Sequence, residues 1–244
     1  PWQVSMTTST QSAASPHPAA LTNFLKAVSA VAWKDLSAEL RSRELLSAMM
    51  IFALMVIFIF NFALELQVKS RQEVTAGVLW VTFAFAGTLG LNRSMAIEKD
   101  RGCLDGLLLA PVDRSAIYFG KMISNLAFMF IIEAIVLPLY SVFYNVNLFN
   151  PGLLGVVILG SLGYTAVGTL LSSMSVQTRT RDVMLPILLF PVVIPVLISA
   201  VKASAGFLNA APMSDILPWL NLLIVYDVIF VSVALMVFDY VVEE

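Results

Sequence analysis

Two acidic residues lie inside long apolar segments, where a charge is expensive to bury. Glu133 occurs in the run FIIEAIV, and Asp227 occurs in the run IVYDVIF. A carboxylate in such a position usually faces another helix or a water-filled path. Two interpretations follow. Either each acid is protonated and hydrogen-bonded to a neighbour such as Asn125, Tyr140 or Tyr226, or it faces water in a translocation path.

Other residues with catalytic or metal-binding chemistry are scarce. One histidine, His17, and one cysteine, Cys103, cannot build a Cys/His metal site, a disulfide framework or a Ser/His/Asp triad. The phosphate-binding pattern GxxxxGK[ST] fails at its first position, which is Ser115, and at its last, which is Met122. We therefore expect no catalysis, no ATP binding and no resident cofactor in this chain alone.

The composition is that of an integral membrane protein. Of the 244 residues, 59% are hydrophobic and 12% are charged, and the mean hydropathy is +0.88. A soluble domain carries roughly a quarter charged residues. The net charge of -2 provides no basic surface for nucleic-acid phosphates. We expect an all-α membrane protein that binds lipid and no nucleic acid.

Six apolar stretches are long enough to cross a bilayer as helices. We expect spans at about 46–64, 75–91, 118–144, 153–175, 183–201 and 217–240. No Lys, Arg or His is expected deep in any of these spans. Small residues spaced by four predict close helix contacts in the second and fourth spans; they are Thr82, Ala86, Gly90 and Ser94, and Ser161, Thr165, Thr169 and Ser173.

The last third of the chain contains features that interrupt helices. Three prolines, Pro186, Pro191 and Pro195, each remove a backbone donor and predict a kinked or broken fifth span. Residues 202–219 are too polar to span a bilayer. They predict a short helical hairpin on the outer side that partly re-enters the membrane.

The distribution of Lys and Arg predicts that both termini are cytoplasmic. With this orientation, 11 of the 14 basic residues fall on the cytoplasmic side. Residues 1–22 are rich in Ser, Thr, Pro and Ala and predict a disordered tail. Apolar residues at helical spacing over 23–45 predict an amphipathic helix on the membrane surface, ahead of a six-span domain over 46–240.

The cytoplasmic loop over 96–116 has the most distinctive pattern. Its segment EKDRGCLDGLLLAP begins with dense charge at Glu98, continues with leucines and ends at Pro111. A short helix parallel to the membrane would turn the leucines toward lipid or a partner and the charges toward water. An ordinary amphipathic connector without a partner is the alternative.

The order of these residues resembles the loop of the CcmB family, from the charged start through the leucine triplet and Ala-Pro to Arg-Ser and Gly-Lys. CcmB is the membrane component of the ATP-binding-cassette (ABC) complex of cytochrome c maturation, which is also called the haem exporter. The resemblance covers about Phe24 to Tyr240. It implies an ABC-2 type (type V exporter-like) permease of the bacterial inner membrane. It also implies a homodimer, a separate CcmA-like ATPase that holds the ATP, and CcmC-, CcmD- and CcmE-like haem-handling partners.

The resemblance further implies that the loop over 96–116 contains a coupling helix that docks on the ATPase. The residues assigned to this contact are Glu98, Asp100, Arg101, Gly102, Leu104, Gly106, Leu107, Leu108 and Pro111. Arg179 and Arg181 would form a second contact. The alternative for these two arginines is that they only anchor a span under the positive-inside rule.

The cargo is not defined by the residues. Haem is the possible cargo, but no span contains a His, a Cys or a deep Arg to hold it, and Met and Tyr are the remaining candidate ligands. We therefore expect a protein that transmits ATPase motion or moves something other than firmly ligated haem. The alternatives are a generic ABC-2 exporter for a lipid, drug or glycan, and a scaffold or intramembrane enzyme that uses Glu133 and Asp227.

Overall fold

The computed structural model describes residues 18–64, 71–100, 112–176, 178 and 180–241, and all regular secondary structure within these residues is helical. Six of the helices are long and apolar enough to cross a membrane. The predicted all-α membrane fold is therefore confirmed. The helices are α1 (Pro18–Ser42), α2 (Glu44–Leu64), α3 (Arg71–Asp100), α5 (Arg114–Tyr144), α6 (Pro151–Ser175), α7 (Arg181–Leu208) and α8 (Met213–Val241).

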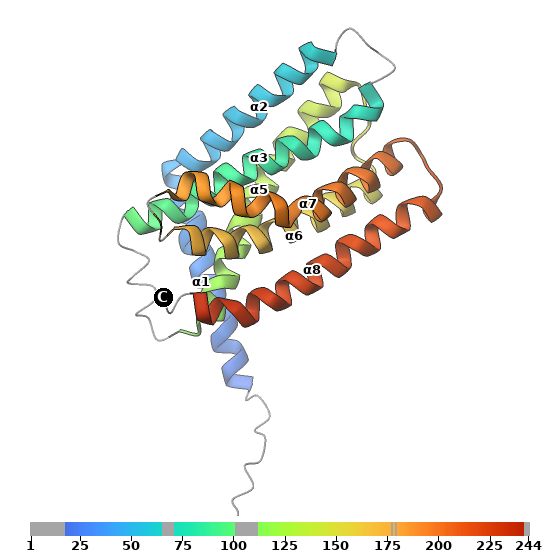
Figure 1. Ribbon diagram of the computed structural model, residues 1–244. Helices are drawn as coiled ribbons and strands as arrows, with labels where there is room; N and C mark the ends of the chain where they lie inside the picture. The colour runs from blue at the N-terminus through green and yellow to red at the C-terminus, as the bar shows by residue number, and fades with distance from the viewer. Residues whose placement is uncertain (1–17, 65–70, 101–111, 177, 179, 242–244) are drawn as a thin grey trace, which may run out of the picture.

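The six long helices run alternately up and down one bundle (Figure 1). One end holds the starts of α2, α5 and α7 and the ends of α3, α6 and α8, and α1 lies beside it; we call this the α1 end. The opposite end, here the far end, holds the connection between α5 and α6 and the turn between α7 and α8. Residues 101–111, between α3 and α5 in the sequence, lie outside the described residues.

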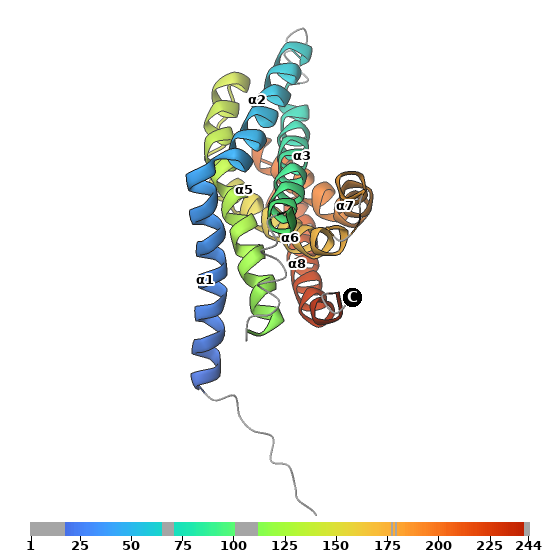
Figure 2. The same ribbon diagram turned by 90° about the vertical axis from the view of Figure 1, so that its left-hand side faces the viewer.

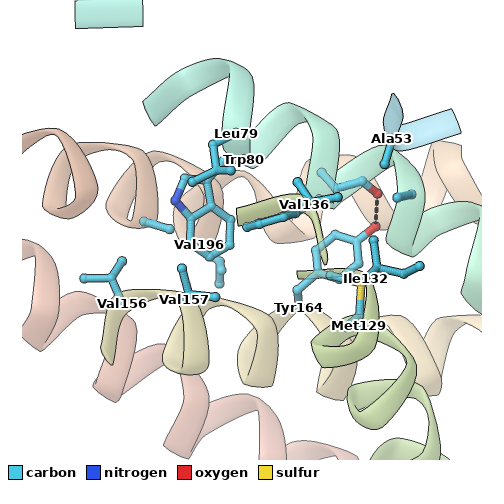
Figure 3. Packing of buried hydrophobic residues seen from close by; sticks show 14 of the residues in the cluster. Ala53, Leu79, Trp80, Met129, Ile132, Val136, Val156, Val157, Tyr164 and Val196 are labelled. Carbon is cyan, nitrogen blue, oxygen red and sulfur yellow. Dashed lines mark hydrogen bonds between the residues drawn. The ribbon is translucent and has the colours of Figure 1, made fainter. Parts of the chain in front are cut away.

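Helices α3 and α6 form the core of the bundle. Trp80 on α3 is buried against α6 and donates a hydrogen bond from Nε1 to Ser204 on α7 at 2.9 Å. Tyr164 on α6 reaches the opposite way and donates to the Ala84 carbonyl on α3 at 2.6 Å. Figure 3 shows both large side chains among the branched aliphatic residues of the core. Each polar tip is satisfied, so the rings fill the core at little polar cost.

Both strips of small residues pack as predicted, except that Ser173 at the end of the second strip is only partly buried. Thr82 and Ala86 on α3, and Ser161, Thr165 and Thr169 on α6, have no exposed surface. Several of the hydroxyls donate to the carbonyl four residues earlier on their own helix, as Thr82 does to Val78 at 2.8 Å. Small side chains that satisfy their own polar groups let the helix backbones approach closely.

The two expectations for the last third of the chain need correction. The fifth span was expected to be kinked or broken; a break is wrong, because α7 runs continuously through Pro186, Pro191 and Pro195 while α3, α6 and α8 pack along it, and a kink stays a prediction. The separate short hairpin predicted over 202–219 is wrong. Helix α7 extends to Leu208 and α8 begins at Met213, so those residues are the ends of two long helices joined by a tight turn.

Helix α1 packs along the first part of α5 (Figure 2). Val28 and Val31 are buried there, and the rings of Phe24 and Phe119 meet edge to face at 6.0 Å between centroids. On its other side α1 leaves large apolar residues exposed, with Trp33 at 68%. An apolar exposed face is what a helix at a membrane surface requires.

The close approach of α1 to α5 depends on Gly120. A Cβ atom at this position would lie 2.6 Å from Val31 Cβ and 3.1 Å from the Val28 carbonyl oxygen. Since neither neighbour is the end of a flexible side chain, Gly120→Ala is expected to push α1 away and to cost about 1–3 kcal/mol of unfolding free energy. Denaturation in detergent micelles, followed by circular dichroism, measures this change.

The control is Gly155→Ala on α6. No atom lies within 4 Å of a Cβ built at this glycine. Ala is the better helix former by roughly 0.5–1 kcal/mol, so the control is expected to be neutral or slightly stabilising. Equal behaviour of the two variants would contradict the packing of α1 on α5.

Candidate functional site

The candidate site is the α1 end of α3, immediately before the predicted coupling loop. Helix α3 ends at Asp100 and α5 begins at Arg114, so these two helices form the base of the loop. Arg101, Gly102, Leu104, Gly106, Leu107, Leu108 and Pro111 lie outside the described residues, as does Arg179. What the structure places is the two helix ends that this segment connects.

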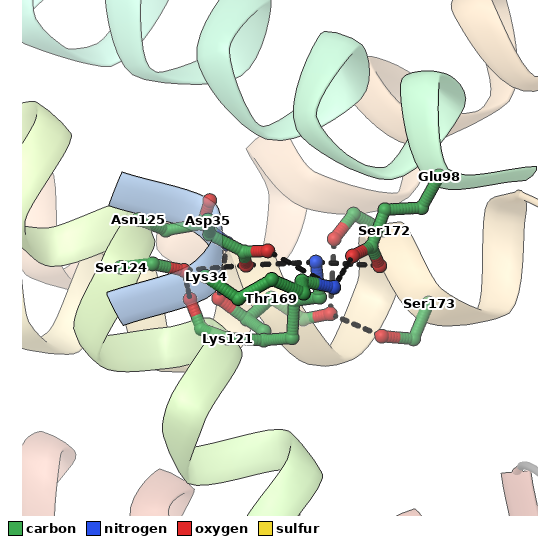
Figure 4. Close-up of polar contacts among 9 residues, drawn as sticks. All are labelled: Lys34, Asp35, Glu98, Lys121, Ser124, Asn125, Thr169, Ser172 and Ser173. Atoms are coloured by element: carbon green, nitrogen blue, oxygen red, sulfur yellow. Dashed lines mark hydrogen bonds and ion pairs between the residues drawn. The ribbon is translucent and has the colours of Figure 1, made fainter. Parts of the chain in front are cut away.

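An ion pair joins the two sides of this base. Lys121 Nζ on α5 lies 2.5 Å from Glu98 Oε2 on α3, and their side chains are only 2% and 9% exposed. Lys121 Nζ also lies 2.8 Å from Asp35 Oδ2 on α1. Figure 4 shows the four charged side chains, Lys34, Asp35, Glu98 and Lys121, converging between the three helices. Two acids balance two bases, so the cluster is neutral.

Helix α1 contributes both signs of charge to the cluster. Lys34 Nζ pairs with Glu98 and lies 3.2 Å from Asp35 Oδ1. Burial alone would lower the pKa of Lys34, but the hydrogen bond to Glu98 and the charges of both acids raise it overall. Burial alone would raise the pKa of Asp35, but Lys121 and Lys34 lower it. The folded protein therefore stabilises the charged forms of both Lys34 and Asp35.

Polar residues on α5 and α6 surround the cluster. Ser124 on α5 donates to Asp35 Oδ2 at 3.1 Å. The next residue of α5, Asn125, donates to the Thr169 hydroxyl of α6 at 3.0 Å. These bonds continue the polar contact from α1 through α5 to the middle of the bundle.

The same end of α3 is bonded to three more helices. The Arg93 guanidinium lies 2.8 Å from Glu44 of α2, Asn92 Nδ2 donates to Asp182 of α7 at 3.0 Å, and Lys99 Nζ donates to the carbonyl of Val176, the C-cap of α6, at 2.7 Å. Glu98 adds its ion pairs with Lys34 of α1 and Lys121 of α5, so the last three turns of α3 are bonded to five other helices. A displacement of this segment would reach all of them.

Helix α1 is also joined directly to α2. Arg43, between them, has a φ of 56°. Glu39 on α1 accepts a hydrogen bond from the backbone N–H of Leu46 at 2.9 Å, in the first turn of α2. A carboxylate at this place satisfies a free donor and favours the positive end of the helix dipole.

The other described residues of the predicted ATPase contact lie at the same end of the bundle. Asp100 borders a groove of about 660 Å³ at the α1 end, together with Glu44, Arg93 and Asp182. Arg181 is the first residue of α7, and its side chain lies outside the described part of the chain. Glu98 is buried, so its carboxylate acts inside the protein rather than on its surface.

Three members of the cluster, Lys34, Asp35 and Lys121, were absent from the predicted site. Lys121 is 1% exposed but lies near the start of α5, and it pairs with Asp35 and Glu98 rather than with Glu133 or Asp227. One sequence signal could have revealed it. Lys34 and Asp35 interrupt the apolar pattern of the first helix, and Lys121 lies inside a predicted span.

Glu133 and Asp227 lie on different sides of α6. Glu133 accepts a hydrogen bond from Ser161, while Asp227 lies against Gly163. Each residue turns a helix by about 100°, so residues two apart point to nearly opposite sides. The two acids therefore do not converge, as an enzyme using both would require.

The residues expected to bond to these two acids contact other groups instead. Asn125 donates to Thr169, and the Tyr226 hydroxyl donates to the Val192 carbonyl at 2.9 Å. Tyr140 stacks on Tyr144, with 4.4 Å between ring centroids. None of the three is bonded to Glu133 or Asp227, because tertiary packing directs each toward a different neighbour.

Removing Lys121 is expected to destabilise the protein strongly. In Lys121→Met, the buried Glu98 and Asp35 would share only Lys34, whose side chain is 45% exposed. Breaking a buried pair from one side costs about 3–5 kcal/mol, which detergent unfolding measures. The control is Arg93→Met, since Arg93 and Glu44 are about half exposed and such pairs contribute about 1 kcal/mol or less. Similar losses in both variants would refute the special role of the buried pair.

Stability is expected to depend on pH through Asp35 and Lys34. The lowered pKa of Asp35 means that its contribution is present above its unfolded value of 3.8 and is lost as the pH falls further. The raised pKa of Lys34 means that its contribution is present below 10.5 and is lost as the pH rises through the folded value. The part of the melting temperature that depends on these two residues should be constant between about pH 5 and 9 and should decrease on either side of this range. In Asp35→Asn the acid-side decrease should become smaller, and an unchanged decrease would contradict this assignment.

Comparison with known proteins gives one consistent family. The model of the family described as CcmB protein matches residues 26–242. A protein named Heme exporter protein B from Pseudomonas aeruginosa is 25% identical over 181 residues, covering 74% of this chain and 81% of the relative. Proteins of the same name from Rhodobacter capsulatus and Paracoccus denitrificans are 25% and 24% identical, over 68% and 67% of this chain and 76% of each relative. Since the family model spans α1 from Lys26 and all six long helices, this chain belongs to the CcmB family.

Proposed function

We propose that this chain is the membrane permease component of an ABC transporter complex that acts in haem export for cytochrome c maturation. In this proposal it couples ATP hydrolysis by a separate CcmA-like ATPase to a conformational change in the membrane. Family membership supports the role in haem export. The observation that carries the coupling role is the buried pair of Glu98 and Lys121 at the base of the predicted coupling loop.

The pair gives the loop a rigid base. Glu98 is three residues before the loop region 101–111 and Lys121 is ten residues after it. Because separating two buried charges is costly, a force on the loop moves α3 and α5 together rather than spreading them. Asp35 and Lys34 add α1 to this unit. The loop thus acts on a stiff block of three helices.

The block can pass this motion to the other spans. Helix α3 is bonded to α2, α6 and α7 close to the loop, through Arg93, Lys99 and Asn92. ATPase closure against the loop would therefore shift several helices as one body. Arg179, between α6 and α7 in the sequence, and Arg181, the first residue of α7, would provide the second ATPase contact on the same side.

The proposed setting follows the family. The α1 end faces the cytoplasm of a bacterial inner membrane, a second copy of the chain completes the permease, and CcmC-, CcmD- and CcmE-like proteins handle haem. None of the six apolar segments contains a His or a Cys, which are common axial ligands of haem iron. We therefore assign this chain a mechanical role, which drives a change in a haem-handling partner without firm ligation of the haem iron.

Bulky residues in the loop should uncouple the complex. Gly102→Trp and Gly106→Trp, in the native organism, are expected to reduce covalent haem on c-type cytochromes to the level of the deletion strain. The reason is that a large side chain prevents close docking of the loop while the six spans stay folded. Haem staining of denaturing gels measures c-type haem, with b-type haem proteins as the internal standard and immunoblots of membranes for the amount of the chain.

Gly155→Ala is the control, since nothing lies within 4 Å of its added Cβ. It should support c-type cytochromes as the unmodified chain does. Full c-type haem in both tryptophan variants would refute the coupling role of the loop. Normal c-type cytochromes in the deletion strain, in an organism with no second maturation system, would refute the role in haem export and favour a generic ABC-2 exporter.

A further inference from the structure

One buried carboxyl group has no partner in the described part of the chain. Asp227 is 5% exposed, and neither of its side-chain oxygens has a hydrogen-bond partner. It is the central residue of α8, and it lies against Gly163, the central residue of α6. Since both helices are long enough to cross a bilayer, this contact lies near the middle of the membrane domain.

Gly163 makes room for this carboxyl group. A Cβ atom at position 163 would overlap Asp227 Oδ1 and would touch the ring of Tyr226 at 3.4 Å. The carboxyl group of Asp227 therefore lies against the backbone of α6, in the space that the missing side chain of Gly163 leaves. The Tyr226 hydroxyl is not available to it, because it donates to the Val192 carbonyl of α7 at 2.9 Å.

Glu98 is a second buried carboxyl group in this protein, and it has cationic partners. Glu98, which is 7% exposed, is paired with both Lys121 and Lys34. Asp227 is buried to the same degree and lies deeper along its helix, but no cation or hydrogen-bond donor of the described residues contacts it. An ionised carboxylate without a partner is far more costly to bury than a neutral acid.

We propose that Asp227 is a proton-binding site at the centre of the membrane domain, occupied by a proton while α8 packs on α6. The ligand is a single proton, and Gly163 is the residue that creates the space. When α8 separates from α6, water reaches the carboxyl group, which then ionises and releases the proton. The packing of these two helices is thereby linked to proton uptake. This inference is independent of the proposed role in haem export.

Infrared spectroscopy tests this proposal on the full chain in detergent micelles or lipid vesicles at pH 7. A protonated carboxyl group gives a carbonyl stretching band well separated from the bands of ionised carboxylates, and the band shifts in D₂O. We expect this band in the unmodified protein and its loss in Asp227→Asn, whose side chain has nearly the same shape as the neutral acid. Absence of any difference between the two proteins would overturn the proposal.

Two substitutions identify the band. Asp215→Asn, at an exposed acid on the same helix, is expected to leave the band unchanged. Glu133→Gln removes the other acid beside α6, whose Oε2 is also without a partner, and the band of Asp227 must persist in it. Loss of the band in Glu133→Gln and its persistence in Asp227→Asn would assign the proton to Glu133 and overturn the proposal.

Two further measurements guard against a folding defect in the variant. Labelling all aspartates with ¹³C in the unmodified protein should lower the frequency of the band, and an unshifted band would exclude any aspartate. In Gly163→Ala the acid is displaced from α6, so the band should weaken or change frequency, whereas Gly155→Ala should leave it as it is. Circular dichroism checks that each variant keeps its helices. An unaltered band in folded Gly163→Ala would contradict the placement of the proton against α6.

Discussion

The buried pair of Glu98 and Lys121 is the constraint on which the α1 end of the bundle depends. Neither charge can stay inside the protein without opposite charges beside it, because an unpaired buried ion is far more costly than the packing around it can offset. The pair therefore fixes α3 against α5 at the base of the loop region 101–111. Asp35 and Lys34 extend the constraint to α1, so three helices hold one another through four charges.

The other polar contacts at this end contribute less to the stability of the fold. Arg93 and Glu44 are about half exposed, so water screens their attraction, and their contact guides orientation more than it stabilises. Their value lies in position, since with Lys99 and Asn92 they attach α2, α6 and α7 to the same segment of α3. Under the proposed coupling role, this segment of α3 would pass motion from the loop to the other helices.

At the centre of the bundle, α6 provides close helix packing and separates two buried acids. Its small residues at positions 161, 165 and 169 let neighbouring helices approach closely, and its two neighbouring acids, Glu133 and Asp227, take opposite sides. The acids thus add polar character to two helix contacts without forming one reactive site. This arrangement agrees with a protein whose spans move against one another, and it gives no support to an intramembrane enzyme.

Hydropathy alone determined the six apolar helices, since a run of about 20 apolar residues has no other stable place than a membrane or a core. The loop pattern from Glu98 to Pro111 was enough to indicate the family. The partners of the charged residues were beyond the sequence. Lys34 is 64 positions from Glu98, and nothing local connects them. Only the packing of α1 on α5, made possible at Gly120, brings the four charges together, because electrostatic energy depends on distance in space and not on separation along the chain.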